Sequence, residues 1–70
     1  MTIQTAAAKQ AEAHNNLTAA RTARNEMAEI VSREQTGFER MVPLTVAVAS
    51  AERAADWADT LLVSAIKAGR

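Results

Sequence analysis

The strongest constraint on how this chain folds is the stretch TGFERMVP, Thr36 to Pro43, which interrupts an otherwise helix-favouring sequence. Ala, Glu, Gln, Arg, Leu and Met, the best helix formers, are frequent on both sides of it. The 70 residues include two glycines and one proline, and only Gly69 lies outside this stretch. The chain is therefore expected to form two long helices separated by one break.

The break combines a helix end with a helix start. Gly37 suits the left-handed residue that follows a helix C-terminus. Pro43 suits the first turn of a helix, whereas in a helix interior it would cost about 3 kcal/mol. Thr36 and Glu39 have capping-box spacing, but a helix starting there would place Pro43 too deep. We predict a helix over about 3–36, a connector over about 37–42 and a helix over about 43–68, in a single domain, 1–70.

A short connector brings successive helices back against each other, so the predicted fold class is all-α, a two-helix antiparallel hairpin. One kinked continuous helix is the alternative. A core in so small a chain rarely supplies more than about 3–5 kcal/mol. The sequence has no Cys and one His, which excludes disulfides and argues against a metal site. Association is the remaining common source of stability, so we expect a homodimer that forms a four-helix arrangement.

The first predicted helix carries a weak seven-residue repeat rich in small side chains. Arg24 interrupts it, either by reaching from its edge into water or by making a buried polar contact that sets the register. The segment His14–Asn16 disfavours a helix interior and predicts a local irregularity. The two rows of the repeat are Ile3, Gln10, Leu17, Arg24 and Val31, and Ala6, Ala13, Ala20, Met27 and Glu34.

The second predicted helix is apolar over more than half of its circumference. Because a helix in a lone hairpin buries only one side, the surplus predicts a further surface that covers it. Trp57 is expected either to fill a dimer core or to anchor a partner protein, and Phe38 and Met41 to close the turn end. The apolar stripe is Leu44, Ala47, Val48, Ala51, Ala54, Ala55, Ala58, Leu61, Leu62 and Ala65, with Val46, Trp57, Ala68 and Ile66 beyond its margins. The candidate partner or dimer contacts are Leu44, Val48, Trp57, Leu61, Leu62 and Ile66.

Charge and chemistry narrow the function. The formal net charge is zero, whereas nucleic-acid binders usually carry a basic excess. A DNA-binding or transcription-accessory dimer that uses Arg21, Arg24 and Arg33 is kept as an alternative, and Arg21 and Arg24 are also candidate polar contacts. No catalytic constellation or phosphate loop is found, so neither an enzyme nor a cofactor is expected. The carboxylates Glu26, Glu29, Asp56 and Asp59 have the positions of solvated-face residues.

The expected function is binding to another protein. The N-terminus does not have the form of a secretory signal, and no apolar run approaches the about 20 residues that span a bilayer, so a cytoplasmic location is expected. In size, hairpin outline and exposed apolar face, the chain is similar to the helical-hairpin co-chaperones of type III secretion systems. It is also similar to small phage proteins that bind and disable a host regulator. We predict a non-enzymatic module that occludes or inhibits a partner protein; a co-chaperone, the DNA-binding dimer and a purely structural subunit are the alternatives.

Overall fold

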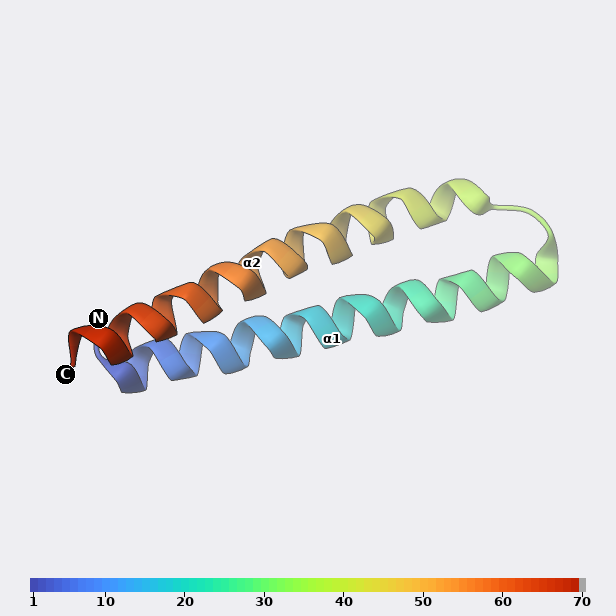
Figure 1. The fold of residues 1–70 in the computed structure, drawn as a ribbon. Helices are drawn as coiled ribbons and strands as arrows, with labels where there is room; N and C mark the ends of the chain where they lie inside the picture. The colour runs from blue at the N-terminus through green and yellow to red at the C-terminus, as the bar shows by residue number, and fades with distance from the viewer. Residues whose placement is uncertain (70) are drawn as a thin grey trace.

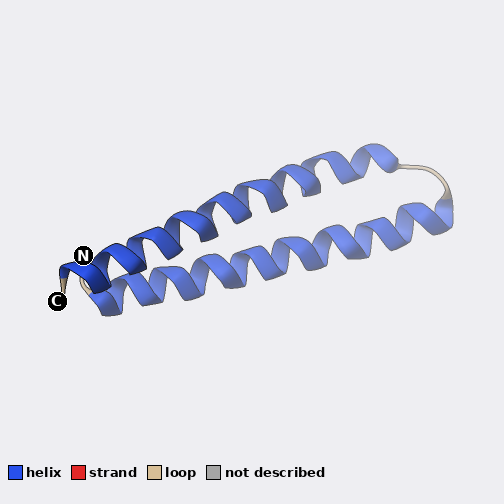
Figure 2. Cartoon of the chain, viewed as in Figure 1, coloured by secondary structure: helices blue, strands red, loops and turns tan. Residues whose placement is uncertain are grey.

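The computed structural model describes residues 1–69 and shows two long antiparallel helices joined by a tight turn (Figure 1). Helix α1 spans Ile3–Glu34, a 3-10 turn η1 spans Phe38–Arg40, and helix α2 spans Met41–Ala68. The hairpin is a rod with extents of 55 × 13 × 11 Å, and the chain's two ends lie together opposite the turn. Within residues 1–69, helix is absent only at the turn and at the first and last residues described (Figure 2). The predicted all-α hairpin is confirmed.

Helix α1 is continuous from a capped start to a left-handed end. The Thr2 side chain accepts a hydrogen bond from the Thr5 backbone N–H, which satisfies one of the unpaired donors of the first turn. At the other end, Gln35 has a φ of 56° and donates its N–H to the Val31 carbonyl at 2.8 Å. The irregularity predicted at His14–Asn16 is wrong, because Asn costs only about 0.7 kcal/mol or less in a helix interior and good helix formers surround it.

The turn explains why Gly37 and Pro43 stand where they do. Gly37 has a φ of 78°, which side chains rarely tolerate, and its carbonyl accepts the Arg40 N–H at 3.0 Å. The resulting 3-10 turn leads directly into α2, which begins at Met41, two residues earlier than predicted. Pro43 is the third residue of α2, still within the turn whose N–H groups have no helical partner. No side chain caps η1, so the capping box does not form.

The two helices meet along one row of side chains each. On α1, the predicted repeat is buried or half-buried from Ala6 to Val31, whereas Ile3 and Glu34 at its ends are exposed. On α2, residues spaced alternately three and four apart form what we call the inner row, and each of them is buried or half-buried. The inner row is Met41, Leu44, Val48, Ala51, Ala55, Ala58, Leu62 and Ala65.

The core between these rows is small. Its buried cluster consists of Leu17, Val48 and Ala55, against which further alanines pack. Alanine brings helix axes close together but removes little apolar area from water, and burial contributes roughly 25 cal/mol per Å². The hairpin is therefore a closely packed but weakly stabilised unit.

A matched pair of valines tests this packing. Val48 is 2% exposed and Val46, two residues away in the same helix, is 60% exposed. We expect Val48→Ala to lower the free energy of unfolding by about 2 kcal/mol, through lost burial and the cavity left behind. Val46→Ala should change it little, because Val is slightly the poorer helix former. Urea unfolding followed by far-UV circular dichroism, at one protein concentration, measures both; equal losses would contradict the assigned inner row.

Candidate interaction surface

A second row on α2, beside the inner row, carries no charge and faces solvent. We call it the uncharged strip. Its members are spaced alternately four and three apart, so they share one side of the helix. All are exposed except Leu61, which is half-buried, and Trp57 at 61% is the largest side chain left open. The uncharged strip is Pro43, Ala47, Ser50, Ala54, Trp57, Leu61, Ser64 and Ala68.

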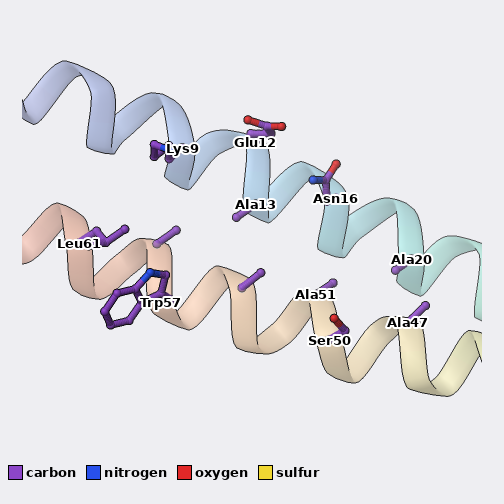
Figure 3. A pocket seen from close by; sticks show the side chains of 12 residues that line it. Lys9, Glu12, Ala13, Asn16, Ala20, Ala47, Ser50, Ala51, Trp57 and Leu61 are labelled. Carbon is purple, nitrogen blue, oxygen red and sulfur yellow. The ribbon is translucent and has the colours of Figure 1, made fainter. Parts of the chain in front are cut away.

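The central part of the uncharged strip and the facing side of α1 form an open groove of about 580 Å³. Figure 3 shows small side chains, among them Ala13, Ala20 and Ala51, along the line where the two helices face each other, and Trp57 and Leu61 on α2 beside it. Lys9, Glu12 and Asn16 stand on the α1 side of the groove. Because half of the residues that line it are alanines, another helix can approach this side closely.

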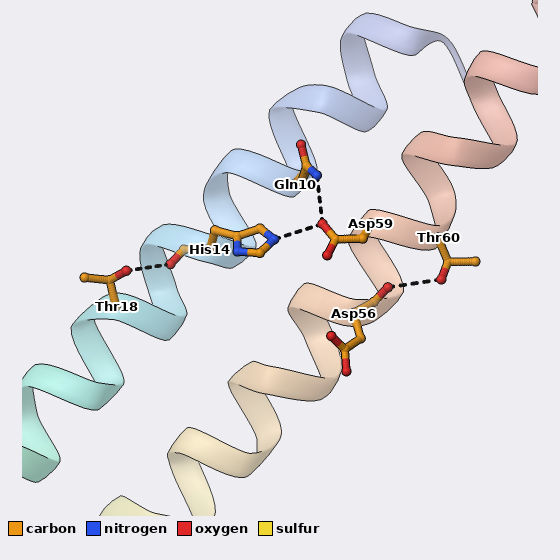
Figure 4. A network of polar contacts seen from close by, with 6 residues as sticks. All are labelled: Gln10, His14, Thr18, Asp56, Asp59 and Thr60. Atoms are coloured by element: carbon orange, nitrogen blue, oxygen red, sulfur yellow. Dashed lines mark hydrogen bonds and ion pairs between the residues drawn. The ribbon is translucent and has the colours of Figure 1, made fainter.

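At the opposite edge of the hairpin, polar side chains of α1 and α2 contact one another. Asp59 Oδ1 accepts a hydrogen bond from Gln10 Nε2 at 2.7 Å and lies 2.9 Å from His14 Nε2 (Figure 4). Farther toward the turn, Arg21 and Glu52 form a loose ion pair, 3.9 Å between Nη2 and Oε1. Polar groups on both helices pair with one another here, so the two edges of the rod offer opposite chemistry.

Asp59 differs from the free carboxylate that its position suggested. Hydrogen bonding from Gln10, and secondarily from His14, lowers the pKa of its carboxyl group below the ordinary value, because both donors stabilise the charged form. Asp59 was predicted to be a solvated-face residue; its side chain is 44% exposed, but it also accepts hydrogen bonds across the hairpin. Glu26, Glu29 and Asp56 are exposed, as predicted.

The two polar residues in the α1 repeat behave differently. Gln10 is half-buried and reaches across to Asp59, which is the kind of contact that sets a register. Arg24 is also half-buried but makes no hydrogen bond or ion pair within residues 1–69, which agrees with a side chain that extends along the helix to water. Of the two alternatives raised for Arg24, the contacts within residues 1–69 agree with the first, and the polar contact between the helices is made by Gln10 instead.

The predicted contact residues divide into three groups. Trp57 and Leu61 lie on the uncharged strip and border the groove. Ile66, 38% exposed, follows Glu52 and Asp59 at seven-residue spacing and so belongs to the polar edge. The prediction that Val48 contacts a partner or a second copy is wrong, because Val48 is 2% exposed within the hairpin and cannot contact a further surface unless the helices separate. Leu44 and Leu62 share its inner row and are half-buried.

The structure shows a second exposed apolar surface that the sequence analysis did not predict. Phe38, Val42 and Val46 are 55%, 63% and 60% exposed. They follow one another at four-residue spacing, which places them on one face next to the turn. We call them the turn-end patch. Phe38 was expected to close the turn end together with Met41; Met41 is half-buried, but Phe38 is exposed, so that prediction is wrong for Phe38. The four-residue spacing was the signal that could have revealed the patch.

Residues 1–69 contain no group of three or more His, Cys, Asp or Glu placed to hold a metal ion. Within the same residues, no hydroxyl bonds to the His14 ring, and Thr18 donates only to the His14 backbone carbonyl (Figure 4). Neither α1 nor α2 combines the length and apolarity that a bilayer crossing requires.

Comparison with known proteins adds no identification: no family model, curated protein or solved structure matches this chain.

The lowered pKa of Asp59 makes stability depend on pH. A depressed carboxyl pKa contributes stability that is full above the unfolded-state value, about 3.9, and is lost as pH falls through the folded-state value. We therefore expect Asp59→Asn to remove part of the acid sensitivity of the melting temperature between about pH 5 and pH 2. Thermal melts across this range measure it.

Asp56→Asn is the matched control, because Asp56 is on the same helix and its carboxylate makes no hydrogen bond within residues 1–69. The control should keep the acid dependence of the unmodified chain. We call the contact of Asp59 with Gln10 and His14 the clamp. An identical pH profile for Asp59→Asn and the unmodified chain would show that the clamp does not form in solution.

Proposed function

We propose that this protein is a non-enzymatic interaction module of the cytoplasm. It pairs with a second copy in a four-helix arrangement and binds another protein, whose surface it occludes. The observation that carries the proposal is the uncharged strip, in which Trp57 stands 61% exposed.

The exposure of Trp57 supports contact with a protein. Trp is among the residues that dominate binding energy at interfaces, where it is typically surrounded by other apolar groups. Around Trp57 the strip offers Leu61 on one side and Ala54 and Ser50 on the other, without a charge. An exposed uncharged surface that contains Trp57 supports an interaction site.

The shape of the hairpin supports occlusion. The groove is open along the rod, and a helix of the second copy or of the target would lie in it lengthwise, which is a common way for proteins to recognise an amphipathic helix. A rod 55 Å long covers an extended surface of its target. Binding would thus deny that surface to other molecules.

Two adjoining apolar surfaces, which meet where Val46 lies four residues before Ser50, offer room for two different neighbours. The uncharged strip lies along one edge of the hairpin, whereas the turn-end patch of Phe38, Val42 and Val46 lies where α2 begins. One surface can pair with a second copy while the other contacts the target protein. A module with both surfaces can associate with itself and still bind.

Recovery of the target tests the proposal. The tagged protein is used to capture proteins from lysate of its native or host cell, and captured proteins are identified by mass spectrometry and purified. Direct binding is then measured by calorimetry for the unmodified chain, Trp57→Arg and Val42→Arg. We expect one of these two substitutions to weaken binding by at least about 30-fold, the loss typical of a binding hot spot.

Thr60→Arg is the control, because Thr60 is exposed on α2 but belongs to neither apolar surface. It should leave target affinity unchanged, and all variants must retain the helical circular dichroism spectrum. Recovery of nothing but copies of the chain itself would favour a purely structural subunit instead.

A further inference from the structure

We infer that the uncharged strip takes a second copy of this chain, docked antiparallel across a two-fold axis at Ala54. This inference rests on the self-association in the proposed function and assigns it a surface, a partner and a register. It also makes Trp57 a dimer contact and leaves the turn-end patch free.

The order of side chains along the strip is complementary to itself. Leu61 and Ala47 lie seven residues to either side of Ala54, and Trp57 and Ser50 lie three and four residues to either side. The two large members, Trp57 and Leu61, are on the C-terminal side of Ala54, and the small Ala47 and Ser50 are at matching distances on its N-terminal side. An antiparallel two-fold contact brings residue i of one copy opposite residue j of the other and the reverse. Each large side chain therefore meets a small one.

The groove provides the space that this pairing requires. Ala20, Ala47 and Ala51 line it, and Figure 3 shows Ala47 and Ser50 toward one end of the view and Trp57 and Leu61 toward the other. Trp57 of the second copy would enter the alanine-lined part near Ser50. Small side chains at the crossing point, Ala54, let the two α2 axes approach closely.

The absence of charge on the uncharged strip also restricts which helix can bind there. From Pro43 to Ala68 the strip contains no charged residue, so a charged helix face would lose its hydration without gaining a partner. The strip of a second copy meets this requirement. The groove's α1 side bears Lys9 and Glu12, one charge of each sign, so two copies meet without a net repulsion there.

The exposed area has the size that a dimer contact needs. A compact protein of 7.5 kDa has an accessible surface of roughly 4,200 Å², whereas the hairpin exposes 4989 Å². The excess, about 800 Å², is close to the roughly 800 Å² that each partner buries in a standard protein interface. Pairing along one side would bring the surface per chain to the value of a compact protein.

Charge substitutions at the proposed axis test the arrangement. Because residue 54 would face its own copy, Ala54→Glu and Ala54→Lys should each weaken dimerisation by at least about tenfold through like-charge contact. An equimolar mixture of the two should restore dimers, since opposite charges then meet. Analytical ultracentrifugation over a range of concentrations measures this, and circular dichroism shows that each variant still folds.

The matched controls are Thr60→Glu and Thr60→Lys, which place the same charges on an exposed position away from the strip and should leave dimerisation unchanged. A second measurement uses the absence of Cys in the natural chain. Ala54→Cys should form a disulfide between copies under mild oxidation, because its two Cα atoms would lie within about 7 Å. Thr60→Cys should not.

Three results would overturn the inference: a monomer at every concentration, a dimer unaffected by Ala54→Glu, or a disulfide through residue 60 in preference to residue 54. These results are distinct from failure of the proposed function. A monomer that still binds a captured target would remove the dimer and keep the interaction module. A dimer with this register that captures no target would keep the inference and remove the occluded partner.

Discussion

The contact of alanine with alanine between α1 and α2 is the constraint on which the rest of the structure depends. Small side chains at Ala13, Ala20, Ala51 and Ala55 let the helices lie close together along the rod. The same side chains bury little apolar area, and the free energy gained from burial scales with that area. Close packing and low stabilisation thus come from one cause, and the larger apolar groups Trp57, Val42 and Phe38 remain outside the core.

Alanines recur along the core beside Leu17 and Val48, and polar contacts between the helices help to specify the register. Asp59 holds Gln10 and His14 from one helix against the other, and it does so at one edge only. Displacing α2 by a single turn along α1 would separate these groups while leaving alanine opposite alanine. The clamp therefore selects one of several nearly equivalent packings, which is a well-attested use of polar groups in helical assemblies.

The one-sided clamp also decides which side of the hairpin remains open. Polar groups that pair across the two helices occupy the edge with Asp59 and Glu52, and this leaves the uncharged strip on the other edge. The proposed dimer and the proposed target contact both follow from this asymmetry. A hairpin with polar pairs on both edges would lack an uncharged surface for association. A hairpin without any polar pairs would lack the contacts that set its register.

The sequence by itself determined the helices, the position of the turn and the excess of apolar surface on α2. These properties depend on local conformational preferences, such as the left-handed backbone at Gly37, and on helical spacing, both of which can be read along the chain. It also identified Trp57 and Leu61 as contact candidates. Only the tertiary structure decided that Val48 lies inside the hairpin while Trp57 lies outside, because both fall within one broad apolar arc and the facing helix alone divides it. The partnership of Asp59 with Gln10 and His14 was hidden for the same reason: these residues are more than 40 positions apart, and only the packed hairpin brings them within hydrogen-bonding distance.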